Sequence, residues 1–326
     1  MTTMTFQTMP APVISKGLLF SRWMKSMTGG SVDLKSFPKN GLTAEVAGFR
    51  FDDNHRRLYN ELCGWSPAAT PITYPQAVAF GLHTALLTHP NFPLSPMGIV
   101  HKANTFSLLR PDLLSHQDFR VTAQLSGIRR AKRGTEFNIS TRFFSGEELV
   151  WEGLATYLSL QRKVRLAEGT PGSDTESVET PSVTTSTETT WKQTRKISVP
   201  SSTGRDYAAL TGDRNPIHTS PFLAKCLGQE GTIAHGMWTA AAALHVFEST
   251  LGRPMSATVK FVAPLPLSAG TIYNIPAFGV FAGPGHPNTD IDRMVVPFQA
   301  RPLGPLDASV KPYLVGTIST VRGESS

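Results

Sequence analysis

Asp213 and His218 are the residues of this chain whose types and spacing are best suited to catalysis. They lie five positions apart in the run Tyr-Ala-Ala-Leu-Thr-Gly-Asp-Arg-Asn-Pro-Ile-His, which covers residues 207–218. A carboxylate and an imidazole can together hold a water molecule and take its proton near neutral pH. Taken alone, the Asp-Arg-Asn-Pro segment is more typical of an ordinary turn, in which the aspartate accepts backbone hydrogen bonds.

The local sequence predicts that two short helices flank this pair. The first is expected over residues 203–210 with Gly212 as its end, because glycine readily adopts the left-handed conformation of a helix C-cap. Asn215 precedes Pro216, and this order disfavours a helical backbone at Asn215 and predicts a turn. A second helix should begin at the Ser220-Pro221 pair, and its apolar face would comprise Phe222, Leu223, Cys226 and Leu227.

A second segment that could take part in chemistry begins at the His235-Gly236 pair. From there to about Phe247 the residues are apolar almost all round, which predicts a buried helix. The first backbone N–H groups of a helix have no partner within it, and they carry a partial positive charge. Gly236 would let an oxygen of a ligand approach such an N–H group, as an oxyanion hole requires. The alternative is that this glycine only allows close packing of the helix on a sheet.

The run as a whole resembles the signature of the MaoC-like dehydratase family, the (R)-specific enoyl-CoA hydratases. The residues that carry the resemblance are Tyr207, Gly212, Asp213, Asn215, Pro216, His218 and Ala224. It implies reversible hydration of a trans-2-enoyl thioester to the (3R)-3-hydroxyacyl thioester in fatty-acid metabolism. Asp213 and His218 would be catalytic and Gly236 would bind the thioester oxygen. Asn215 would shape the substrate-binding loop, and His235 is expected to be structural.

The order of the expected elements suggests a duplicated α+β unit. The first set comprises a buried helix over 74–87 and a run of strands over 98–158. The second set begins with the helix after His235 and a strand over 257–262. The resemblance implies a double hotdog, in which two antiparallel sheets each wrap a central helix. The N-terminal hotdog, 46–163, lacks the signature and is expected to be catalytically silent, and 191–326 would be the catalytic hotdog.

The remaining segments are expected to lie outside the two hotdogs. Residues 1–45 form an N-terminal extension, and 164–190 form a linker rich in serine and threonine. The linker has few apolar residues, and burying so little surface does not offset the entropy lost on ordering. The segment 1–31 has no acidic residue, so both an organelle transit segment and an ordinary amphipathic helix remain open.

Composition excludes several classes of function. The chain has 326 residues, a net charge of +7 and two cysteines, which are far apart in sequence. No cysteine or histidine spacing typical of a zinc site is present, and neither metal nor cofactor is expected. A basic cluster at 129–133 is expected at the tip of a hairpin, and it lacks the interleaved aromatic residues that stack on bases. No nucleic-acid partner and no membrane span are therefore expected.

The cysteine content indicates a reducing compartment, so the cytoplasm is the default location, with mitochondria or another organelle left open. The expected partner is an acyl-CoA or acyl-carrier-protein thioester, and a homodimer is left open. Two other functions remain open at this stage. A hotdog thioesterase would direct water at the carbonyl carbon, and a non-catalytic acyl-binding subunit would not react at all. The sequence does not specify the acyl chain length or the carrier.

Overall fold

The structure of the protein is a computed structural model, which describes residues 2–11, 32–33, 37–38, 40–96, 98–114, 118–160, 164–165, 191–267, 277–283, 295–303 and 309–320. The elements of its first half are β1 (Thr2–Phe6), β2 (Val32–Asp33), β3 (Leu42–Phe49), α2 (Asp53–Cys63), α3 (Tyr74–Val78), α4 (Phe80–Thr88), β4 (Ile99–Leu108), the 3-10 helix η2 (Pro111–Leu113), β5 (Phe119–Ala131), β6 (Gly134–Ser145), β7 (Glu148–Ser159) and β8 (Val164–Arg165).

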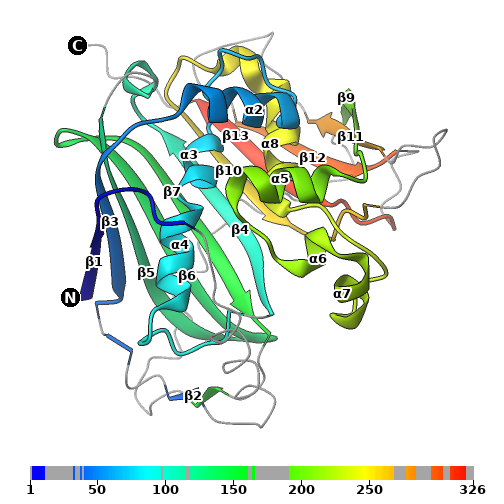
Figure 1. Ribbon diagram of the computed structural model, residues 1–326. Coiled ribbons are helices and arrows are strands. Elements are labelled where there is room, and N and C mark those ends of the chain that lie inside the picture. The colour runs from blue at the N-terminus through cyan, green and yellow to red at the C-terminus, as the bar shows by residue number, and fades with distance from the viewer. Residues whose placement is uncertain are drawn as a thin grey trace.

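The elements of the second half are β9 (Lys192–Ser198), α5 (Thr203–Thr211), α6 (Pro216–Thr219), α7 (Pro221–Cys226), α8 (Gly236–Leu244), the 3-10 helix η3 (His245–Thr250), β10 (Met255–Phe261), β11 (Ala277–Ala282), β12 (Val295–Pro302) and β13 (Leu314–Thr320). In each half a curved sheet wraps a buried helical segment, α3 and α4 in the first half and α8 in the second (Figure 1). The α+β double hotdog expected from the sequence is confirmed.

The sheets of the two halves are continuous. Among the described residues, eleven strands form one sheet in the order β1-β3-β5-β6-β7-β4-β10-β13-β12-β11-β9, and β2 and β8 form a separate parallel pair. The halves meet where β4 pairs antiparallel with β10, from Met255 opposite Leu108 to Lys260 opposite Ala103. The two sheets expected from the sequence are therefore the two parts of a single sheet.

Along the strands, buried side chains alternate with partly exposed ones, and this pattern explains why each half folds around its helix. In β5, Phe119, Val121, Ala123 and Leu125 point inward and are at most 1% exposed, while the residues between them are partly exposed. Period-two burial of this kind is what a sheet with one covered face requires. Residues 238–244 of α8 are buried on every side, as its apolar sequence predicts.

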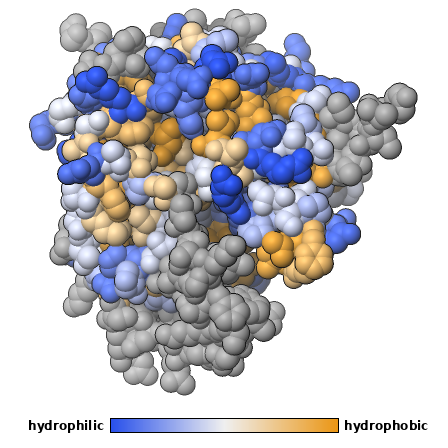
Figure 2. All heavy atoms as spheres, viewed as in Figure 1, coloured by the Kyte–Doolittle hydropathy of each residue, from blue (hydrophilic) through white to orange (hydrophobic). Residues whose placement is uncertain are grey.

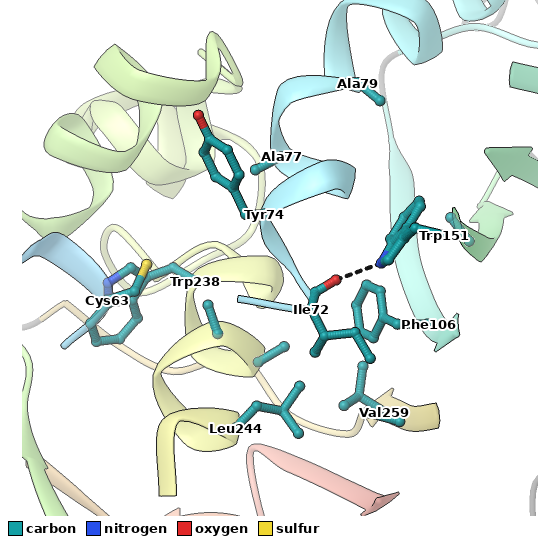
Figure 3. Packing of buried hydrophobic residues seen from close by; sticks show 14 of the residues in the cluster. Cys63, Ile72, Tyr74, Ala77, Ala79, Phe106, Trp151, Trp238, Leu244 and Val259 are labelled. Atoms are coloured by element: carbon teal, nitrogen blue, oxygen red, sulfur yellow. Dashed lines mark hydrogen bonds between the residues drawn. The ribbon is translucent and has the colours of Figure 1, made fainter. Parts of the chain in front are cut away.

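The apolar core extends across the joint between the halves. Trp151 of β7 donates a hydrogen bond from its ring to the carbonyl of Ile72, and Phe106 lies beside it (Figure 3). Val259 of β10 and Leu244 of α8 belong to the same cluster of buried residues. The two halves thus share one core instead of forming two separate ones.

Two tryptophans reach across the joint in opposite directions. Trp65, which follows α2, donates a hydrogen bond to the carbonyl of Ala241 in α8, at 3.0 Å. Trp238 of α8 donates to the carbonyl of Leu62 in α2, at 3.1 Å. Both rings are nearly buried. Helix α2 of the first half is therefore fastened to the central helix of the second half.

Some local expectations differ from the structure. The helix expected over 74–87 is broken at Ala79 into α3 and α4. Thr2–Phe6 forms a strand parallel to β3, which the sequence did not predict. The prediction that α7 buries an apolar face is wrong. The helix has only six residues and buries Ala224 alone. The residues expected on that face are exposed, namely Phe222, Leu223, Cys226 and Leu227. Orange atoms gather at the position of this helix in Figure 2.

The expected linker and the possible transit segment fall largely outside the described residues. Within the part of the chain that is described, no helix is both long enough and apolar enough to cross a membrane.

Limited proteolysis tests how firmly the halves are joined. Protease should cut first between about residues 169 and 190, where the sequence lacks the apolar residues that order a chain. The two fragments should then co-elute on a sizing column, because the β4–β10 pairing and the shared core remain intact. Two fragments that separate without denaturant would contradict this account of the joint.

The variants Trp65→Ala and Trp238→Ala test the same joint through the stability of the protein. Each removes a buried ring and a hydrogen bond between the halves, so the free energy of unfolding should fall by about 3 kcal/mol or more. Phe222→Ala, at a site that is 73% exposed, is the control and should change stability by less than about 0.5 kcal/mol.

Candidate active site

Asp213, His218 and His235 form one cluster beside the N-terminus of α8. Each offers one polar atom, and these three atoms lie within 4.8 Å of one another. The rings of His218 and His235 are stacked, with centroids 3.8 Å apart and an angle of 29° between their planes. The structure therefore brings together the two residues that the sequence singled out, and it adds His235 to them.

The backbone around Asp213 is fixed by two neighbouring helix ends. Helix α5 stops at Gly212, which has a positive φ of 77° and donates to the carbonyl of Ala208. The Asp213 carboxylate then accepts a hydrogen bond from the N–H of Asn215, at 3.3 Å. Asn215 in turn caps α6 by accepting from the N–H of Ile217. Asp213 lies in a loop after α5, as expected, but the segment expected to be a loop also contains the short helix α6, and His218 lies in that helix.

A hydrogen bond to the main chain sets the tautomer of His218. Its Nδ1 lies 2.8 Å from the carbonyl oxygen of Ile233, and a carbonyl can only accept, so Nδ1 carries the proton. The Nε2 atom is then left with a free lone pair. Burial, and then repulsion from His235, lower the pKa of His218 to about 4, although the Asp213 carboxylate acts in the opposite direction. His218 is a neutral imidazole near neutral pH, which is the form a general base needs.

His235 connects the loop to the central helix. Its Nε2 donates to the main-chain carbonyl of Asp213, at 2.9 Å, and its ring is 2% exposed. Its Nε2 is 3.9 Å from the Asp213 carboxylate, beyond hydrogen-bond distance. Burial lowers the pKa of His235. The structural role expected for His235 is thus supported by a specific contact that holds Asp213.

Two glycines allow the cluster to assemble. A Cβ atom on Gly236 would lie 2.9 Å from the ring of Phe261, so the ring packs directly on this glycine. A Cβ atom on Gly204, in α5, would lie 2.1 Å from the carbonyl oxygen of His218. Gly236 therefore does allow close packing of the helix on the sheet, which was the alternative to an oxyanion hole. Its N–H group nevertheless has no partner within α8, because Gly236 is the first residue of that helix.

Gly204 was not among the residues singled out from the sequence. Its importance comes from a contact with the carbonyl of a residue fourteen positions later in the chain. The neighbouring sequence predicts a helix there but gives no sign of which of its sides the His218 backbone will touch.

Comparisons with known proteins identify relatives of this chain. A family model described as a MaoC like domain matches residues 182–265, the segment that contains the cluster. The protein 3-hydroxyacyl-thioester dehydratase X of Mycobacterium tuberculosis is 32% identical to this chain over 202 residues. The matched segment is 61% of this chain and 68% of that protein.

Solved structures share the fold over most of the chain. The crystal structure of HtdX of Mycobacterium tuberculosis has a TM-score of 0.65 and 24% identity, and it covers 85% of this chain and 98% of its own. That of a MaoC-like dehydratase from Phytophthora capsici has a TM-score of 0.62 and 16% identity, with 88% and 97% covered. The shared fold, and a relative 32% identical over two thirds of its own length, show that this chain belongs to the MaoC-like dehydratase family.

Proposed function

We propose that this protein catalyses the reversible addition of water to a trans-2-enoyl thioester, giving the (3R)-3-hydroxyacyl thioester of fatty-acid metabolism. One observation carries the proposal. A carboxylate and a neutral imidazole with a free Nε2 lie together beside the first residue of a buried helix, whose N–H group has no partner within the helix. The name of the Mycobacterium tuberculosis relative, a 3-hydroxyacyl-thioester dehydratase, supports the same reaction.

The two side chains would share one water molecule above the β-carbon of the substrate. As the water oxygen bonds to the β-carbon, one of its O–H bonds breaks and the proton passes to the Asp213–His218 pair. The electrons of the double bond move to the thioester oxygen, where the N–H of Gly236 stabilises the developing enolate charge. The pair then returns a proton to the α-carbon on the same face. Because the two groups are close, they act as one titrating unit.

The thioester carbonyl itself activates the double bond, so the proposed mechanism uses neither a metal nor an organic cofactor. Among the described residues, the group with the spacing to bind a metal ion is the cluster of Asp213, His218 and His235. Each histidine donates one ring N–H to a main-chain carbonyl, which fixes the orientation of its ring. Asn215 would act by shaping the loop, since its side chain is engaged in capping α6.

We also propose that catalysis belongs to the C-terminal hotdog, 191–326, and that the N-terminal hotdog, 46–163, is catalytically silent. The two acidic residues at the start of α2 support this division, because each already bonds to a neighbour in its own helix. Asp52 caps the helix by accepting from the N–H of His55, and Asp53 pairs with Arg56. The segments 1–45 and 164–190 would be an extension and a linker.

The substrate would arrive as a thioester of coenzyme A or of an acyl carrier protein. A reducing compartment such as the cytoplasm suits the two free thiols, of which Cys63 is buried and Cys226 is exposed. A thioesterase is the second candidate from the sequence, and it would release free thiol where the hydratase would not.

Substitution of the pair tests the proposal directly. Asp213→Asn and His218→Ala should each lower kcat for hydration of crotonyl-CoA by at least about a hundredfold, the scale of general acid–base catalysis. Asp206→Asn removes an exposed carboxylate from α5 and should leave kcat unchanged, as should prior treatment of the wild type with a chelator. Near-full turnover in either dyad variant would overturn the assignment.

The pH dependence of kcat/KM gives a second test. His218 accepts a proton only while neutral, and its pKa of about 4 lies below the value of about 6.5 for a free histidine. The rate should therefore persist as the pH falls through about 6.5 and decline only toward the lower value. An acid limb at the free-histidine pKa, in protein that is still folded, would show that His218 is not the buried base described here.

Circular dichroism at each pH is the necessary control. Burial lowers the pKa of His83 to about 3 and that of His101 to about 4. In the unfolded chain these histidines bind protons at higher pH than in the folded protein. Their contribution to stability is thus complete above the free-histidine pKa and is lost as the pH falls toward the folded values.

A further inference from the structure

Strand β4 carries a bulge that turns a histidine toward the interior. Asn104, Phe106 and Leu108 point inward and are at most 1% exposed, so regular alternation would place Lys102 inward next. The pairing of β4 with β7 slips between His101 and Ala103. Lys102 pairs instead with Glu136 and is 43% exposed in its side chain. Bulges often redirect a side chain beside an active site, and here the redirected residue is His101.

The ring of His101 is held between two aromatic rings. It stacks on Tyr157 of β7, with centroids 4.7 Å apart, and it lies 5.0 Å from the ring of Phe261 in β10. Tyr157 is itself fixed by a hydrogen bond to His83. Phe261 is the ring that packs on Gly236. His101 comes from the first half, yet a single ring separates it from the proposed oxyanion site in the second half.

Asn104, on the same inward face of β4, borders the same helix end. Its Nδ2 lies 3.8 Å from the sulfur of Met237, the residue after Gly236 in α8. The side chains of His101 and Asn104 therefore approach the first turn of α8 by two routes, one through Phe261 and one through Met237.

Both residues hold a buried polar atom without a partner. Among the described residues, His101 Nε2 and Asn104 Oδ1 have no hydrogen-bond partner. Asn104 Oδ1 can only accept a hydrogen bond, whereas the neutral ring of His101 presents Nε2 as an acceptor in one tautomer and as a donor in the other. Burial keeps the ring neutral, although the charge of Asp213 is near enough to raise the pKa of His101. Buried polar atoms without hydrogen-bond partners are costly, and they are rare in folded proteins.

We propose that His101 and Asn104 form a subsite for hydroxyl groups carried on the acyl chain of the substrate. A hydroxyl is the group on an acyl chain that suits both atoms, because it can donate to Asn104 Oδ1 and can either donate to or accept from His101 Nε2. A plain alkyl chain would leave both polar atoms without a partner, and sites built to bind a hydroxyl discriminate strongly against analogues that lack it. The proposal rests on the hydration reaction proposed above and names the acyl group that this site prefers.

The wild-type protein provides the first test. The kcat/KM values for hydration would be compared for a straight-chain trans-2-enoyl-CoA and for analogues of equal length bearing one hydroxyl, moved outward carbon by carbon from the β-carbon. At least one hydroxylated analogue should be preferred by about tenfold or more. If every hydroxylated analogue is as good as or worse than the plain chain, the subsite does not exist. No turnover of any enoyl thioester would instead refute the proposed function.

The second test uses shape-conserving variants. His101→Phe keeps the ring between Tyr157 and Phe261, and Asn104→Leu keeps a side chain of similar size against Met237. Each should reduce the preference for the hydroxylated analogue, measured as the ratio of its kcat/KM to that of the plain chain. A general structural defect would lower both values together and leave this ratio unchanged, which would count against the subsite.

Lys102→Met is the matched control, because it changes the neighbouring side chain of the same bulge, which faces outward. The wild-type ratio should persist in this variant. If one of the two inward variants does not fold, the other variant and the wild-type comparison still decide the question.

Discussion

The hydrogen bond from His235 to the main-chain carbonyl of Asp213 is the contact on which the site depends. It joins residues 22 positions apart and ties the loop that carries the proposed dyad to the end of a helix that is buried on every side. Ile233, two residues before His235, accepts the hydrogen bond that fixes the His218 ring. Gly236, one residue after His235, carries the N–H group of the first turn of α8. The four-residue segment 233–236 thus sets the positions of the proposed base, carboxylate and oxyanion donor together.

Because the sheet continues from β4 to β10, the segment that carries this site also lies against the first half. Trp65 and Trp238 fasten the two halves, each donating a hydrogen bond to the other half, and Phe261 brings His101 of β4 within one ring of Gly236. In the proposed division of labour, the half without the signature would therefore help to recognise the substrate on which the other half acts. Duplication of the hotdog would in this way separate chemistry from recognition within one chain.

Sequence reasoning was sufficient where a local rule governs the backbone. Gly212 ends α5 and the Asn215-Pro216 pair places the turn, so the dyad loop was predictable. Contacts between distant residues were not predictable. The bulge that turns His101 inward reverses the alternation that strand reasoning relies on, and the contact of Gly204 with the His218 backbone depends on how α5 is finally packed. Expectations for 164–190 remain predictions.

The stereochemistry of the reaction tests the central claim most directly. The purified protein would be incubated with a trans-2-enoyl-CoA in deuterium oxide, and the product analysed for configuration at both new centres. One shared water held by Asp213 and His218 predicts the (3R)-hydroxyacyl thioester, with oxygen and deuterium added to the same face. A (3S) product, addition to opposite faces, or release of free thiol would contradict a single site in which these two residues act on one water.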